Sequence, residues 1–311
     1  MTTNEGAITD LPPLADPLSL LTILETERAL VDRELDAILP SEDNYPTSIH
    51  RAMRYSIFAG GKRLRPILCL EAGRLFGAER PSLLRVAATL ELIHTYSLIH
   101  DDLPAIDNDD LRRGKPTCHR AFGEATAILA GDALLTLAFE NLAVSGAPGD
   151  AARLRVIREL ARAIGTRDGM MAGEIVDLEA TGRAVEASTL QYIHSAKTGA
   201  FITAAVRCGA IYASAAESDL TRLTTYGEKV GLAFQIADDL LDVLGSREKM
   251  GKAVGKDGHQ QKPTYPGLYG VEESQRIAGR LIAEACEALA PYGERAQRLV
   301  GLAHFLITRQ S

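Results

Sequence analysis

The segment at 83–101, LLRVAATLELIHTYSLIHD, constrains the fold more than any other part of the sequence. It is long enough for about five helical turns, and apolar residues occur almost all round it, which is typical of a helix buried on every side. A second segment of this kind lies at 125–143. Such helices need other elements packed around them, so the two segments predict a large core.

Most of the remaining chain shows helical periodicity as well. Apolar residues recur at helical spacing in five more segments, at 18–38, 151–164, 188–213, 218–244 and 272–290. The breaks are clusters of Gly, Pro and Asp at 60–61, 104–116, 145–150, 245–258 and 263–270. The sequence shows neither strands alternating with Gly-rich turns nor a linker between domains. We therefore expect an all-α fold, with a flexible N-terminal tail at 1–17 and a single large helical domain at 18–311.

The composition supports this expectation and argues against several functions. Hydrophobic residues make up 46% and aromatic residues only 5%, which favours helices over strands. A net charge of −7 disfavours nucleic acid as a partner. No uncharged apolar run reaches about 18 residues, so we expect no stable membrane insertion. The first basic side chain is Arg28 and the four cysteines lack metal-ligand spacing, which predicts a cytoplasmic protein with reduced thiols and no targeting peptide.

The first of two acidic motifs, DDLPAID at 101–107, ends the apolar helix predicted at 83–101. Pro104 disfavours a straight helix here, so we expect the chain to loop and to bring Asp107 back towards Asp101. Arg112 and Arg113 follow, and their forked donors suit phosphate oxygens. The alternative is a charged surface loop that pairs with itself.

The second acidic motif, at 238–242, lies within a helical segment. Asp238 and Asp242 are four residues apart and share a helix face, which Gln235 joins. Carboxylates this close repel one another unless a cation lies between them, and oxygen ligands favour Mg²⁺, Ca²⁺ or Mn²⁺. The alternative is a solvated acidic face. The apolar flanks at 231–234 and 240–241 argue against it, because acids on a buried helix need partners.

Three further features carry groups that suit anions. The GGKRLR segment at 60–65 has two glycines that let the backbone approach an anion, on which Lys62 and Arg65 can close. The KTG segment at 197–199 offers a lysine and a hydroxyl at a helical position. The Gly-rich loop after the second acidic motif holds Lys252, Lys256 and Lys262. In isolation, the KTG segment is better explained as a surface lysine with a packing glycine, and the alternative for the Gly-rich segment is a flexible basic loop.

Taken together in this order, the five features resemble the trans-isoprenyl diphosphate synthases, and most closely the bacterial farnesyl diphosphate synthases, also called geranyltranstransferases. The resemblance runs from about residue 51 to residue 269 and is most specific at 94–119, HTYSLIHDDLPA followed by LRRGKPTCH. It implies a helical bundle of the isoprenoid synthase type around a central cavity, with the two acidic motifs facing each other across its mouth. It also implies diphosphate substrates, Mg²⁺ with Mn²⁺ as an alternative, and a homodimer.

The resemblance also implies a role for each matching residue. The metal ligands would be Asp101, Asp102 and Asp107, with Asp238 as the main ligand of the second motif, supported by Asp239 and Asp242. The allylic diphosphate would be held by Arg112, Lys197, Thr198, Gln235, Lys252 and Lys256. Isopentenyl diphosphate would be bound by Lys62, Arg65, His94 and Arg113. The reacting centre would be formed by Lys197, Thr198, Gln235 and Asp238.

In such an enzyme, metal ions and cationic side chains stabilise the departing diphosphate, so that the allylic C–O bond ionises. Tyr96 lies roughly 7–8 Å down the helix from Asp101. In the family a ring there, with Ser97 beside it, forms the floor of the chain-length cavity and goes with farnesyl diphosphate. The alternative is that Tyr96 only packs between helices.

Two positions depart from the bacterial pattern. Ala172-Gly173-Glu174 stands where Gly-Gly-Gln is usual, which adds a charge near the cavity wall, and Asn108 also occurs in geranylgeranyl diphosphate synthases. Geranylgeranyl diphosphate is therefore the alternative product. A terpene cyclase and a non-catalytic synthase subunit are the alternatives from other classes. Two intact acidic motifs and the 60–65 anion site argue against both.

Overall fold

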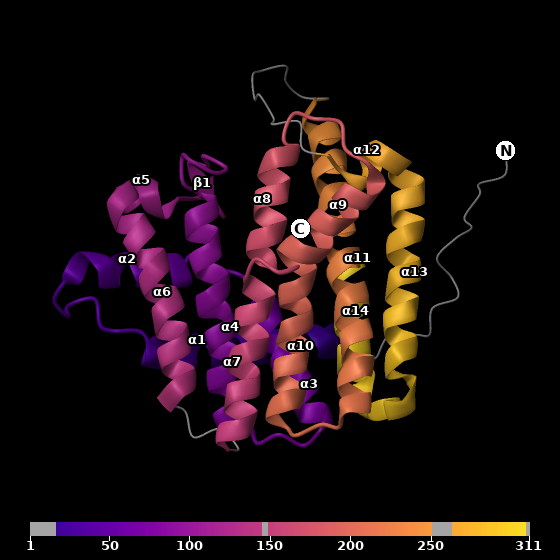
Figure 1. Ribbon diagram of the computed structural model, residues 1–311, viewed down its shortest axis with the longest axis horizontal. Helices are drawn as coiled ribbons and strands as arrows, with labels where there is room; N and C mark the ends of the chain where they lie inside the picture. The colour runs from indigo at the N-terminus through magenta and orange to yellow at the C-terminus, as the bar shows by residue number, and fades with distance from the viewer. Residues whose placement is uncertain (1–16, 145–148, 251–262, 309–311) are drawn as a thin grey trace. The chain divides into compact units, whose positions relative to one another are not determined.

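The computed structural model describes residues 17–144, 149–250 and 263–308, which form helices joined by short connections and one small hairpin (Figure 1). The helices fall into two compact units. The N-terminal unit comprises Leu21–Ala161 and Ala205–Ala216, and the C-terminal unit comprises Met1–Leu20, Arg162–Ala204 and Glu217–Ser311. The all-α prediction is confirmed, and each unit carries one acidic motif. The single domain and its central cavity stay predictions, and the expected tail lies outside the described residues except for Pro17.

The N-terminal unit is built round α4 (Arg80–Asp101), which is the helix predicted at 83–101. Thirteen of its 22 residues are buried, so the prediction of a central helix is confirmed. Its neighbours in the unit are α2, α3 and α6. The helices that belong wholly or partly to this unit are α1 (Pro17–Ile38), α2 (Thr47–Ile57), α3 (Leu64–Leu75), α5 (Cys118–Phe122), α6 (Glu124–Val144), α7 (Asp150–Ile164) and α10 (Ala200–Tyr212).

Helix α6 is less buried than its sequence predicts. It packs on α2, α4 and α5, and these neighbours cover only part of its circumference. Ile128 and Leu129 are 43% and 57% exposed. Of the described helices, α6 alone is long and apolar enough to cross a membrane, over 124–143, and 39% of its most apolar window is buried. The prediction that 125–143 is buried on all sides is therefore wrong for one face.

The C-terminal unit centres on α11 (Glu217–Met250), which packs along α13 (Val271–Leu289) and on α14 (Gln297–Thr308) (Figure 1). The other elements of the unit are α8 (Met170–Ala180), α9 (Ala187–Ile193), η1 (His194–Gly199), α12 (Tyr265–Tyr269) and η2 (Ala290–Ala296). The break predicted from Gly245 is wrong, because α11 continues to Met250. One glycine costs a helix only about 1 kcal/mol, so a single glycine does not have to end it.

Two local features were not expected from the sequence. The segment predicted as one helix at 188–213 contains a π-helical turn, η1, between α9 and α10. Such turns are rare and occur frequently at functional sites. The break at 104–116 holds an antiparallel hairpin of two short strands, β1 (Leu111–Arg112) and β2 (Lys115–Pro116). Both features lie among the predicted substrate-binding residues.

Candidate active site

The first acidic motif begins where α4 ends. Asp101 is the last residue of the helix, and the chain then turns through the proline predicted to interrupt it. The backbone N–H of Asp107 donates to the carbonyl oxygen of Asp101 at 2.8 Å. The predicted return of Asp107 to Asp101 is therefore confirmed. Both side chains are half-buried.

Asp102 is held by the hairpin. The Nε and Nη2 atoms of Arg112, in β1, donate to Asp102 Oδ1 at 2.9 and 2.6 Å. Asp102 is only 3% exposed. Burial raises the pKa of the Asp102 carboxyl, and Arg112 counteracts part of that shift. Asp102 thus fixes Arg112 beside the motif, and the predicted roles of Asp102 as a metal ligand and of Arg112 in diphosphate binding stay predictions.

The glycine pair before α3 packs against the second arginine of the hairpin. Gly60 and Gly61 have φ angles of 105° and 134°, which only glycine adopts without strain. Arg113 Nη1 donates to the carbonyl oxygen of Gly60, and a Cβ on Gly61 would lie 2.7 Å from the same nitrogen. The backbone angles thus favour glycine at both positions, and Gly61 also leaves room for Arg113, a residue predicted to bind isopentenyl diphosphate.

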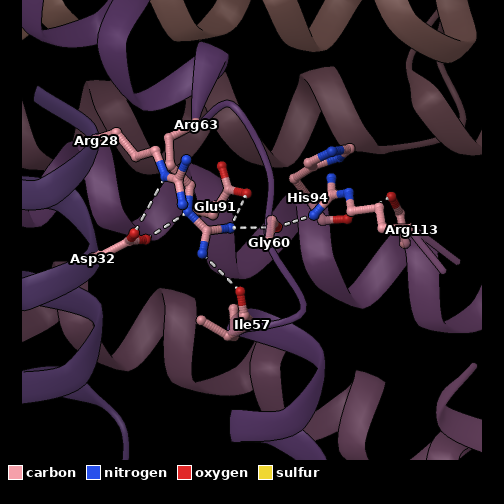
Figure 2. Close-up of polar contacts among 9 residues, drawn as sticks. Arg28, Asp32, Ile57, Gly60, Arg63, Glu91, His94 and Arg113 are labelled. Carbon is pink, nitrogen blue, oxygen red and sulfur yellow. Dashed lines mark hydrogen bonds and ion pairs between the residues drawn. The ribbon is translucent and has the colours of Figure 1, made fainter. Parts of the chain in front are cut away.

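Arg63 anchors this loop to helices α1, α2 and α4, a role that the sequence did not reveal (Figure 2). Its guanidinium donates to Asp32 Oδ1 at 2.7 Å, to Glu91 Oε1 at 2.8 Å and to the carbonyl oxygen of Ile57 at 2.7 Å. Arg63 is 3% exposed, so it is a structural anchor for the loop that presents the exposed Lys62. The only signal of this role in the sequence is that Arg63 is a third basic residue between Lys62 and Arg65, the two predicted ligands of the diphosphate.

His94 lies on α4, on the same face of the helix as Asp101 and about two turns before it. Its surroundings are strongly positive. Burial lowers its pKa well below the usual range, and nearby positive charges lower it further, from Arg65, Arg113, Arg112 and Arg63. At neutral pH the imidazole is therefore uncharged. A cluster of arginines round a neutral histidine is an environment that an anion would stabilise.

The second acidic motif lies on α11, as predicted. Asp239 is 9% exposed, and its Oδ2 atom lies 2.9 Å from both His194 Nε2 and the backbone nitrogen of Tyr265. The His194 and Tyr265 rings stack with centroids 5.4 Å apart. Asp239 therefore ties α11 to η1 and α12. That it also binds metal stays a prediction, as for the half-buried Asp238 and the exposed Asp242.

The π-helical turn places Lys197 against α8. At Gly173 a Cβ would overlap the backbone nitrogen of Lys197, so the two backbones touch. Lys197 Nζ lies 2.7 Å from Glu174 Oε2 and 2.7 Å from Asp177 Oδ2. Burial lowers the pKa of Lys197, but the two carboxylates raise it more, and the net shift is upwards. Lys197 is thus a permanent cation, with the buried Thr198 beside it.

Tyr96 is 4% exposed and meets His100 edge-on, with ring centroids 5.8 Å apart. Its hydroxyl is buried and has no hydrogen-bond partner among the described residues. Ser97 donates to the carbonyl oxygen of His94 at 2.9 Å. This packing fits the alternative in which Tyr96 fills space between helices, and its role as a cavity floor stays a prediction.

The remaining predicted residues differ in what can be said of them. Gln235 is on α11 and half-buried, as is Arg65 on α3. Lys252 and Lys256 lie outside the described residues. Within the described ranges, no three His, Cys, Asp or Glu side chains converge into a ready metal centre. The oxygen-only ligands of the motifs still fit Mg²⁺, which proteins bind through one or two carboxylates completed by water and substrate phosphates.

Comparison with known proteins decides the family. The model of the polyprenyl synthetase family matches residues 46–292. The chain belongs to this family. The chain is 48% identical over 289 residues to a dimethylallyltranstransferase of Fischerella ambigua, and the match covers 92% of this chain and 82% of the relative. It is 45% identical over 304 residues to a geranylgeranyl diphosphate synthase of Cyanophora paradoxa, covering 97% and 100%.

Solved structures of the family agree with the fold. The crystal structure of an FPP/GFPP synthase from Zymomonas mobilis matches this chain with a TM-score of 0.84 and 38% identity, over 94% of this chain and 99% of that one. These relatives and neighbours are trans-prenyltransferases, as the resemblance implied. Their names do not confirm farnesyl diphosphate as the product, and the curated relatives favour the geranylgeranyl alternative.

Proposed function

We propose that this polyprenyl synthetase joins isopentenyl diphosphate to an allylic diphosphate in an Mg²⁺-dependent reaction. The observation that carries the proposal is the pairing of acids with cations in each unit. Asp101 and Asp107 lie beside the arginines of the β1–β2 hairpin, and Asp238 and Asp242 lie on a helix that packs on the turn holding Lys197. Acid groups that bind metal, next to cations that bind phosphate, suit diphosphate substrates.

The metal ligands in this proposal are the aspartates of the two motifs that are at least partly exposed. They are Asp101 and Asp107 from the first motif and Asp238 and Asp242 from the second, with Asp102 and Asp239 holding the two motifs in place. Bound Mg²⁺ would neutralise charge on the diphosphate leaving group.

The chain's own cations would bind and orient the two substrates. Lys197 would supply a permanent charge that stabilises the departing allylic diphosphate, and Thr198 and Gln235 would line the same site. The loop anchored by Arg63 would bind isopentenyl diphosphate through Lys62, Arg65, Arg113 and the neutral His94. The double bond of isopentenyl diphosphate then attacks the allylic carbon, and this step requires no nucleophilic side chain.

Two products compete in this proposal. The curated relatives support geranylgeranyl diphosphate, with twenty carbons. Tyr96 supports farnesyl diphosphate, with fifteen, because its buried ring lies below Asp101 where it would block a longer chain. We propose geranylgeranyl diphosphate as the main product. If Tyr96 forms the floor of the chain-length cavity, the product is farnesyl diphosphate instead.

The proposal extends to assembly and compartment. The exposed Ile128 and Leu129 on α6 suit burial against a second copy of the chain, so we propose a homodimer. One relative, from Arabidopsis thaliana, is named as a subunit of a heterodimeric enzyme, and light scattering of the purified chain would distinguish the two assemblies. All four cysteines are free thiols, which agrees with a reducing compartment such as the cytoplasm.

The test is a product analysis with purified protein. The chain is incubated with Mg²⁺ and isopentenyl diphosphate, and with dimethylallyl, geranyl or farnesyl diphosphate in turn. Chromatography of the dephosphorylated products should show twenty-carbon alcohols, and chelation of the metal with EDTA should abolish them. Fifteen-carbon alcohols that are not extended would favour farnesyl diphosphate. Cyclic hydrocarbons from a single substrate would favour a terpene cyclase, and no product at all would refute the enzyme assignment.

A further inference from the structure

Glu174 gives the site around Lys197 a second carboxylate, in addition to Asp177. It lies on α8, at the position where the sequence departs from the expected Gly-Gly-Gln. Its Oε2 atom and Asp177 Oδ2 each lie 2.7 Å from Lys197 Nζ. One ammonium group is therefore shared by two carboxylates, and the three side chains together are net negative.

The backbone makes this arrangement rigid. Glu174 and Asp177 are three residues apart on α8 and so share one face of the helix. Gly173 brings that face against the backbone of Lys197, because any side chain there would overlap its nitrogen. The side chains of Glu174, Asp177 and Lys197 are 16%, 11% and 24% exposed. Their charges are thus screened less than those of surface pairs.

Most of the N–H donors of Lys197 already face protein carboxylates. An ammonium group has three N–H donors, and two of them face the carboxylates. One donor remains for an oxygen of a diphosphate group. The other oxygen of Glu174, Oε1, is buried and has no hydrogen-bond partner among the described residues. Among the described residues, the Glu174 carboxylate is therefore tied to Lys197.

We propose that Glu174 is a positioning residue that fixes Lys197 Nζ and weakens its hold on a diphosphate group, so that this group leaves the site more readily. The inference rests on the proposed function, in which Lys197 binds the allylic diphosphate. Glu174 acts through the lysine and touches no substrate. It therefore affects how tightly diphosphate is held more than it affects the fold.

The experiment measures binding of inorganic diphosphate by calorimetry at a fixed Mg²⁺ concentration. Glu174→Gln keeps the shape and one acceptor but removes the charge. Lys197 Nζ is then held less tightly and can turn a second donor to diphosphate, and one such hydrogen bond predicts that the variant binds diphosphate about 5-fold more tightly or better. Glu179→Gln is the matched control, since Glu179 is exposed on the same helix, and its affinity should stay within about 2-fold. In kinetics, Glu174→Gln should lower KM for the allylic substrate and lower kcat.

A second substitution shows whether the effect passes through the lysine. In a Lys197→Gln background, Glu174→Gln should leave the affinity for diphosphate unchanged. Thermal unfolding identifies a misfolded variant, and Glu174→Ala, which should also tighten binding, then replaces the glutamine. Binding by Glu174→Gln that equals the wild type or is weaker overturns the role of Glu174. A wild-type protein that binds no diphosphate overturns the proposed function instead.

Discussion

Replacing Arg63 with methionine should destabilise the N-terminal unit strongly. The Arg63 side chain is 2% exposed and its partner Glu91 is 3% exposed. Methionine fills a similar volume but leaves the Glu91 carboxylate buried without its cation. Removing one partner of a buried ion pair costs about 3–5 kcal/mol, which corresponds to a fall in Tm of about 5–8 °C in a chain of this size.

Thermal unfolding followed by circular dichroism measures this effect. Arg276→Met is the matched control, because its ion pair with Glu273 is largely exposed, and it should cost less than about 1 kcal/mol. Adding Glu91→Gln to Arg63→Met should restore part of the loss, since the unpaired charge is removed. The Arg63 variant should also raise KM for isopentenyl diphosphate, because the loop carrying Lys62 loses its anchor. Equal Tm values for the Arg63 and Arg276 variants, with KM unchanged, would refute this reasoning.

Three further outcomes follow from the described residues. Gly173→Ala should lower stability by several kcal/mol, roughly as over-packing does, because its methyl group overlaps the backbone of Lys197. The control Gly279→Ala has open space around it and should be neutral or stabilising by up to about 1 kcal/mol. Urea unfolding compares the stability of the two variants. Tyr96→Ala should lengthen the product if the ring is a floor, and an unchanged chain length by mass spectrometry would show that it only packs. Burial raises the pKa of Cys286 to about 11. Labelling of Cys286 by a thiol reagent should therefore be slow at pH 8 and accelerate towards pH 11. Rapid labelling of the folded protein at pH 8 would contradict the burial of this thiol.

The fold and the shape of the first motif followed from local rules. An apolar helix that ends in acids and meets Pro104 has to turn, and the hydrogen bond from Asp107 to Asp101 is the outcome. The helical face shared by Asp238 and Asp242 followed from spacing alone. These predictions succeeded because they depend on residues within a few turns of one another.

The features that the sequence did not reveal depend on distant partners. The exposed face of α6 reflects which neighbours surround it and not its own composition. Asp239 pairs with His194, and Arg63 pairs with Asp32 and Glu91; the two residues of each pair are 28 or more positions apart. No local pattern marks such pairs.

The central claim is that both acidic motifs serve the same condensation, and one measurement tests it directly. The rate of condensation of geranyl with isopentenyl diphosphate is compared for Asp101→Asn, Asp238→Asn and the control Asp110→Asn, an exposed aspartate outside both motifs. Loss of electrostatic stabilisation of the leaving group predicts a fall in kcat of at least about 100-fold for each of the first two variants and little change for the control. A wild-type rate in either Asp101→Asn or Asp238→Asn would contradict the claim.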